Sequence, residues 1–229
     1  MPRLEQASKV TPSSPTCIGL PYRFHELACM SGYSSLEGIK MGDKEWFHFG
    51  IKKGWTIVIL RAGEGKATLA FSPSVGPEGL IVSLEPVVES YRQLVAKVAK
   101  HRLTNVIPLM TAIWSRTGPG LINIHNIAAG HSILWKRKRG KRRIHCTTWD
   151  HLMDVLQLRH VDYVKCDVEG SENEFLNGMN KVLPDRVIIE EHLRYCRDPE
   201  KTLNEIYSLL KKKGYTYSKR GIYIFAKRV

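Results

Sequence analysis

Carboxylate residues cluster directly after an apolar segment in VDYVKCDVEGSENEFLNGM, residues 161–179. The apolar start predicts a buried strand, and side chains alternate along a strand, so Lys165 and Asp167 are expected on the same face. Asp167 then lies where the strand leaves the sheet, and Glu169 lies on that face if the chain stays extended. A nearby carboxylate can raise the pKa of its neighbour, an effect that Lys165 would oppose. The pair therefore indicates a candidate general base.

Further polar residues follow in the same part of the chain. Glu172 and Glu174 are expected in the first turn of a helix, where acidic side chains interact favourably with the helix dipole. His192, just after a predicted strand over 186–191, is a second candidate base, although a surface histidine without a catalytic role is an alternative. Hard divalent cations prefer carboxylate oxygens. Five residues could bind such a cation if their strands are adjacent: Asp167, Glu169, Glu190, Glu191 and His192. Spacing along the chain does not require such a site, and our prediction includes no metal.

A glycine turn and a distant carboxylate indicate a nucleotide-like ligand. The turn AGEG, residues 62–65, separates a predicted strand from a helix, and glycines let a backbone approach a ligand closely. Glu85 ends the next predicted strand about twenty residues later, where a carboxylate can accept both hydroxyl groups of a ribose. The alternative for Glu85 is a surface residue before Pro86.

Alternating strands and helices would position these residues. Five short apolar runs rich in β-branched residues predict strands at 55–60, 80–85, 105–110, 161–167 and 186–191. Helices are predicted at 67–75, 87–102 and 202–214, the last with Gly214 as its C-cap, and two strand-like runs close the chain over 215–228. The pattern predicts an α/β fold with a Rossmann-like, doubly wound, mostly parallel sheet and a C-terminal antiparallel hairpin. Ligands bind such sheets at the carboxyl ends of the strands, where the strand order reverses.

The chain divides into two predicted parts. Residues 1–54 are expected to form a tail and a small strand-bearing extension, because aromatic and charged residues alternate in EWFHFG, residues 45–50. Residues 55–229 are expected to form the main domain. Residues 121–145 fit the alternation poorly and predict an insertion that carries a basic loop.

Charge and composition narrow the function classes. The 229-residue chain has a net charge of +13, and seven of its 35 basic residues lie in KRKRGKRR, residues 136–143. This octet could attract RNA or another anionic partner, and a solvated loop is the alternative. No apolar run reaches the roughly 18 residues of a membrane span. Five dispersed cysteines do not indicate a disulfide framework, so we expect a cytoplasmic protein. The oligomeric state is not predicted.

Several segments together resemble one enzyme family. KCDVEGSENEFLNGM (165–179) resembles the signature of the FkbM-type family of S-adenosylmethionine-dependent methyltransferases. Collinear segments from about Gly54 to the C-terminus also resemble that family: VGPEGLIVSLEP (75–86), TAIWSRTG (111–118), TTWDHLM (147–153) and VIIEEH (187–192). The resemblance implies the class I methyltransferase fold and S-adenosylmethionine as cofactor. The cofactor residues it implies are Arg61, Ala62, Gly63, Gly65, Thr68, Glu85, Pro86, Thr111, Ala112 and Asp167.

The first motif departs from the family pattern. Ile59 stands where the family has an acid, and Arg61 stands at the first glycine, where it adds bulk and positive charge beside a cationic cofactor. Three functions therefore stay open. The first is O-methylation of a hydroxyl on a sugar or small metabolite, with a small-molecule or glycan acceptor and with Asp167, Glu169 and His192 as candidate catalytic residues. The second is RNA methylation using residues 136–143, and the third is a non-catalytic, methyltransferase-like binding protein.

Overall fold

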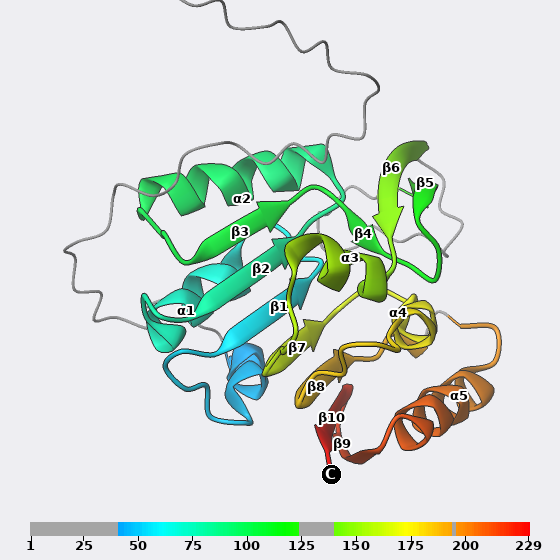
Figure 1. Ribbon diagram of the computed structural model, residues 1–229. Helices are drawn as coiled ribbons and strands as arrows, with labels where there is room; N and C mark the ends of the chain where they lie inside the picture. Colours follow the sequence, from blue (N-terminus) through cyan, green and yellow to red (C-terminus); the bar gives the residue numbers. More distant parts are fainter. Residues whose placement is uncertain (1–40, 124–139, 194–195) are drawn as a thin grey trace, which may run out of the picture. The chain divides into compact units, whose positions relative to one another are not determined.

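The computed structural model describes residues 41–123, 140–193 and 196–229 of the chain (Figure 1). All the described residues belong to one compact unit of the chain. Residues 1–40, which include the predicted tail and part of the predicted extension, lie outside the described residues. Of the aromatic segment EWFHFG, residues 45–47 lie in a 3-10 helix, η1 (Met41–Phe47), and residues 48–49 form the turn that follows it.

A seven-stranded sheet forms the centre of this unit, in the order β3-β2-β1-β7-β8-β10-β9. All neighbouring strands pair in parallel except β10, which is antiparallel to both β8 and β9. The strands are β1 (Thr56–Leu60), β2 (Leu80–Leu84), β3 (Val106–Leu109), β7 (Tyr163–Cys166), β8 (Arg186–Glu190), β9 (Tyr215–Arg220) and β10 (Tyr223–Arg228). This is the predicted doubly wound, mostly parallel sheet with a closing antiparallel hairpin, and the fold prediction is confirmed.

The strand order reverses between β1 and β7. The chain passes from β1 outward through β2 to β3 and later returns to place β7 on the other side of β1 (Figure 1). The carboxyl ends of these two strands are therefore the topological switch point of the sheet. Pro108 lies in β3, which is an edge strand, so its missing N–H does not interrupt the sheet.

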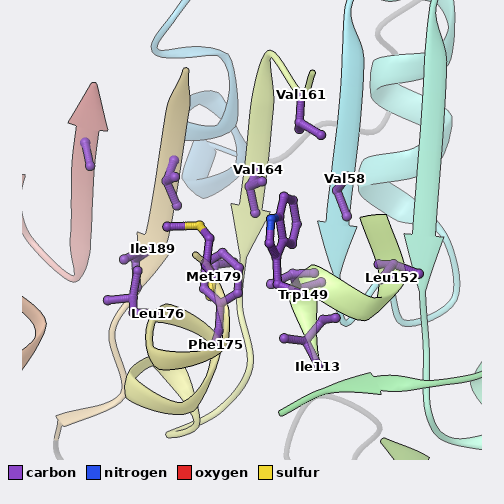
Figure 2. Packing of buried hydrophobic residues seen from close by; sticks show 14 of the residues in the cluster. Val58, Ile113, Trp149, Leu152, Val161, Val164, Phe175, Leu176, Met179 and Ile189 are labelled. Atoms are coloured by element: carbon purple, nitrogen blue, oxygen red, sulfur yellow. The ribbon is translucent and has the colours of Figure 1, made fainter. Parts of the chain in front are cut away.

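Helices cover both faces of the sheet. Each central strand has apolar side chains on both of its faces, and each face packs against helices. Ile57 and Ile59 contribute to one core with α1 (Lys66–Val75) and α2 (Val88–Lys100). Val58 and Leu60 contribute to the other core with three helices: α3 (Trp149–Leu156), α4 (Glu172–Gly178) and α5 (Pro199–Lys212). Figure 2 shows this second core, in which the rings of Trp149 and Phe175 pack edge to face at 5.6 Å. Burial on both faces holds the strand ends in fixed positions.

A smaller sheet follows β3 along the chain, in the order β4-β6-β5. Its strands are β4 (Ala112–Ile113), β5 (Gly118–Asn123) and β6 (Lys141–Thr147). We expected residues 121–145 to form an insertion that carries the basic octet, residues 136–143, on a loop. The two ends of the segment instead pair as antiparallel strands, so the loop prediction is wrong for residues 141–143. Of the basic octet, Lys141, Arg142 and Arg143 begin β6, while residues 136–139 lie outside the described residues. Within the described ranges, no helix has the length and apolar character needed to cross a membrane.

Candidate functional site

The ends of three neighbouring strands bring the predicted catalytic residues together. Arg61 follows β1, Asp167 and Glu169 follow β7, and His192 lies just past β8. The Nη1 atom of Arg61 lies 3.3 Å from Asp167 Oδ1 and 3.2 Å from Glu169 Oε1. The Nε2 atom of His192 lies 3.7 Å from Asp167 Oδ1 and 3.5 Å from Glu169 Oε2. These residues form one charged cluster at the switch point.

Asp167 is held in its ionised form. Its Oδ2 accepts a hydrogen bond from Lys165 Nζ at 3.1 Å, and Arg61 approaches its other oxygen. Burial alone would raise the pKa of Asp167, but the charges of Lys165, Arg61 and His192 outweigh it and lower the pKa to about 2. Lys165 is itself buried, with Nζ 4.8 Å from the ring centroid of Trp46 in η1. Asp167 therefore provides a fixed negative charge and is a poor proton acceptor at neutral pH.

Glu169 differs from Asp167 in the direction of its pKa shift. Its side chain is buried, and burial raises the pKa of Glu169 although the charges of Arg61 and His192 lower it. Its backbone is in the left-handed region, with φ 53°. Between the two carboxylates, Glu169 is better suited to accept a proton from a substrate.

His192 is buried among carboxylates. Its Nδ1 lies 3.2 Å from Glu172 Oε1, and the same oxygen accepts a hydrogen bond from the Gly170 N–H at 3.0 Å. Burial alone would lower the pKa of His192, but the hydrogen bond with Glu172 and the charges of Asp167 and Glu169 raise it. Our prediction gave Glu172 only a helix-terminus role, so its contact with His192, twenty residues away in sequence, was missed. No feature of the sequence indicated that α4 and the end of β8 are adjacent.

The glycine turn and Glu85 form a second part of the site. Glu85 Oε2 accepts a hydrogen bond from the Gly63 N–H at 2.8 Å, and Oε1 accepts one from the Val87 N–H at 2.9 Å. Burial raises the pKa of Glu85 against the effect of both hydrogen bonds and of Arg61. Ala62, also buried, donates its N–H to the Leu84 carbonyl at 2.7 Å. The structure thus joins the turn after β1 to the end of β2.

The remaining predicted cofactor residues make structural contacts. Thr68 is fully buried and shares a hydrogen bond of 2.8 Å with Ser83, which links α1 to β2. A Cβ at Gly65 would lie 2.9 Å from Leu94 Cδ1, so the absence of a side chain there permits close packing on α2.

The other predicted cofactor residues follow β2 and β3. Thr111 Oγ1 lies 3.0 Å from His145 Nδ1 in β6. Pro86 is half-buried next to Glu85, and Ala112 is a buried residue of β4.

The alternative of a metal site is not favoured by the contacts. Possible ligand atoms of Asp167, Glu190 and His192 lie within 4.8 Å of one another. Both oxygens of Asp167, however, already contact the cationic groups of Lys165 and Arg61. Glu191 Oε2 accepts the Leu193 N–H at 2.9 Å. Because the protein's own cations already contact both oxygens of Asp167, we assign no metal to this cluster.

The sequence and the fold are both similar to those of known methyltransferases. The family described as methyltransferase FkbM domain matches residues 58–217. The structure of methyltransferase FkbM from Methylobacillus flagellatus is similar with a TM-score of 0.52 at 12% identity, over 80% of this chain and 50% of its own. Fibrillarin from Aeropyrum pernix, solved with natively bound S-adenosyl-L-methionine, is similar with a TM-score of 0.50 at 17% identity, over 77% of this chain and 67% of its own. At these identities the two structures show a common fold. No curated protein matches the sequence.

Proposed function

Because the chain belongs to the FkbM methyltransferase family, we propose that it transfers the methyl group of S-adenosylmethionine to a hydroxyl of a sugar or another small metabolite. The observation that carries the proposal is the position of Glu85 and Glu169. One carboxylate lies at the end of β2 beside the glycine turn, and the other lies beyond β7 next to a buried histidine. A nucleoside site and a proton acceptor thus lie along the carboxyl edge of one sheet.

The residues present fit the cofactor. Gly63 has φ +57°, and a Cβ at this position would meet nothing within 4 Å, so the turn borders open space. Each oxygen of Glu85 accepts one backbone hydrogen bond and retains acceptor capacity for a ribose hydroxyl. We expect Glu85 to hold the ribose and the backbone of Gly63 to approach the cofactor. The negative charge of Asp167 suits a positively charged sulfur.

Arg61 sets a limit on cofactor affinity. Its guanidinium already contacts both Asp167 and Glu169, so it neutralises part of the charge that would attract a cation. We therefore expect cofactor binding that is weaker than a glycine at this position would give.

Proton transfer is assigned to Glu169 and His192. When bound, the cofactor supplies a methyl group on a sulfonium, and the sulfur keeps the electrons of the broken bond. The acceptor oxygen forms the new bond to carbon, and Glu169 accepts the hydroxyl proton, because its raised pKa makes it the stronger base of the two carboxylates. His192 Nε2, 3.5 Å from Glu169, is within reach of that proton. Lys165 and Arg61 keep Asp167 charged throughout.

Two measurements test the proposal. Calorimetric titration with S-adenosylmethionine is expected to show one binding site per chain, and no binding would favour the non-catalytic alternative. The protein is then incubated with a methyl-labelled cofactor and a protein-free, RNA-free metabolite extract. Label that resists alkali but is released as methyl iodide by hot hydriodic acid indicates methyl ethers. Label released by alkali indicates esters, and label that resists both treatments indicates methylated nitrogen or carbon; either result would overturn the assignment of a hydroxyl acceptor.

RNA methylation is a second candidate, favoured by the exposed start of β6. Lys141 and Arg143 are exposed and lie on the same face of this strand. Arg142, between them, forms an ion pair with Glu89 in the first turn of α2, four residues after Glu85. This ion pair places the start of β6 close to the start of α2, which follows the proposed ribose site. Phosphate contacts from such basic residues would make binding depend steeply on salt.

The RNA candidate is tested by binding to a structured RNA at several salt concentrations. Replacing Lys141 and Arg143 with glutamine is expected to reduce the salt slope by about one to two, because each phosphate contact contributes close to one. The matched control replaces the exposed Lys52 and Lys53, which precede β1, and removes the same charge. Equal losses in both variants, or no RNA binding at low salt, would count against RNA as the acceptor.

A further inference from the structure

We propose that Glu172 is a positioning residue that fixes the ring orientation and the tautomer of His192. Its importance for catalysis rests on the methyl transfer proposed above, but the contact itself can be tested without cofactor or acceptor. Glu172 Oε1 lies 3.2 Å from His192 Nδ1, and both side chains are buried. Our prediction from the sequence gave Glu172 only a role at the helix terminus, and the family comparison assigns it none.

The orientation of the Glu172 carboxylate is itself fixed by the backbone. The Gly170 N–H donates to the same Oε1 at 3.0 Å. Gly170 has φ +99°, in the left-handed region that favours glycine, so the chain can turn there and direct its N–H toward the carboxylate. The carboxylate is thus held from one side by the backbone and from the other by the imidazole.

A comparison with Glu174 separates this role from that of a helix terminus. Both glutamates lie in the first turn of α4 and interact with the same helix dipole. Glu172 is 3% exposed, whereas Glu174 is only half-buried and has no hydrogen bond or ion pair with another residue in the described ranges. Stabilisation of the helix end does not require burial of a carboxylate against an imidazole. The placement of Glu172 indicates a function directed at His192.

The contact determines which nitrogen of His192 exchanges a proton. An ionised carboxylate only accepts hydrogen bonds, so Nδ1 must carry the hydrogen that faces Glu172. Nε2 is then the atom that gains or loses a proton, and it faces Glu169 at 3.5 Å and Asp167 at 3.7 Å. Glu190, at the end of β8, adds a fourth nearby carboxylate. In the neutral ring, Nε2 can receive the proton that Glu169 takes from the acceptor hydroxyl.

Nitrogen NMR of the histidine side chains tests the proposal in the unliganded protein, with a His192→Asn variant to identify the signals. In the wild-type protein we expect His192 to carry its hydrogen on Nδ1 above its titration midpoint. In Glu172→Gln, the amide oxygen can still accept from Nδ1, so the tautomer is retained while the midpoint moves to lower pH. In Glu172→Leu, both the tautomer preference and the raised midpoint are lost. The matched control, Glu174→Gln, is expected to change neither.

The possible outcomes are distinct. A neutral His192 with its hydrogen on Nε2 in the wild-type protein would overturn the proposal, and this measurement does not depend on whether any variant of Glu172 folds. An unchanged midpoint in Glu172→Gln, or an equal shift in Glu174→Gln, would also overturn it. A failure to bind S-adenosylmethionine would instead contradict the proposed function and leave the NMR result unaffected.

Discussion

Arg61 and Glu169 are both non-glycine residues in the left-handed backbone region, and their side chains form an ion pair at 3.2 Å. Their φ angles are 62° and 53°, and they follow neighbouring parallel strands. Such a conformation costs about 1 kcal/mol or more for each residue with a side chain. Strained residues persist when the surrounding structure holds them, and they are concentrated at functional sites. The ion pair therefore connects two strained turns at the switch point of the sheet.

Replacing Arg61 with glycine is expected to strengthen cofactor binding. The change removes one positive charge near the proposed position of a sulfonium and leaves Asp167 and Glu169 with less internal compensation. At an effective dielectric constant near 20, removal of such a charge is worth about 1–2 kcal/mol, or roughly tenfold in affinity. Calorimetric titration with S-adenosylmethionine at neutral pH measures the effect. The control, Arg61→Lys, keeps the charge and is expected to give no gain. Weaker binding by Arg61→Gly would show instead that the guanidinium contributes to holding the cofactor.

The two glycines of the first turn are expected to respond differently to alanine. At Gly63 a methyl group enters open space, so Gly63→Ala should lower the free energy of unfolding by only about 1 kcal/mol, from the positive φ. Because that space is where we place the cofactor, affinity for S-adenosylmethionine should fall at least tenfold. At Gly65 the methyl group would lie 2.9 Å from buried Leu94, so Gly65→Ala should lose about 2–3 kcal/mol of stability. Urea unfolding and calorimetry on both variants measure the two effects. Similar results for both glycines would contradict this division of roles.

The strands and the edge that carries the site could be predicted from the sequence. Runs such as WTIVIL and LIVSLE are short, apolar and β-branched, as expected for strands buried on both faces. Polar residues directly after such runs lie at the carboxyl edge of a parallel sheet, which placed Glu85 and Asp167 correctly along that edge. The prediction depended only on local patterns and on the general location of ligand sites in such sheets.

The contacts between distant segments could not be predicted in the same way. Arg61 and Asp167 are 106 residues apart, and they meet only because β7 pairs with β1. Strand order is chosen by packing of the whole sheet, which a local pattern does not record. The high charge of residues 136–143 indicated exposure, but an exposed strand and an exposed loop have the same composition, so Lys141 at the start of β6 was assigned wrongly.

Replacing Glu85 with glutamine tests the proposed ribose site. The amide has one acceptor oxygen, so the N–H of either Gly63 or Val87 loses its partner and faces an amide NH₂. We expect the free energy of unfolding to fall by about 1–2 kcal/mol and affinity for S-adenosylmethionine to fall at least tenfold. The control is Glu78→Gln, which neutralises an exposed carboxylate between α1 and β2. If Glu85→Gln binds the cofactor as the control does, the ribose assignment is wrong.

The stability contributed by Asp167 should depend on pH in a defined direction. Its pKa is lowered to about 2 in the folded protein, so the folded state favours the ionised form. Stability from this group is fully present above the pKa of the unfolded chain and is lost as pH falls toward the folded value. The shift corresponds to a contribution on the order of 2 kcal/mol at neutral pH.

The measurement compares urea unfolding of the wild-type protein and Asp167→Asn at pH 6, 4 and 3. The wild-type protein should be more stable by on the order of 2 kcal/mol at pH 6. The difference should shrink between pH 4 and pH 3, because Asp167 takes up a proton there in the unfolded chain but not in the folded protein. Glu78→Gln, at an exposed position, controls for general effects of acid on a basic chain. A difference that stays constant from pH 6 to pH 3 would mean that Lys165 and Arg61 do not lower the pKa of Asp167. Asp167 would still be ionised at neutral pH, but the neighbouring cations would not stabilise its charge.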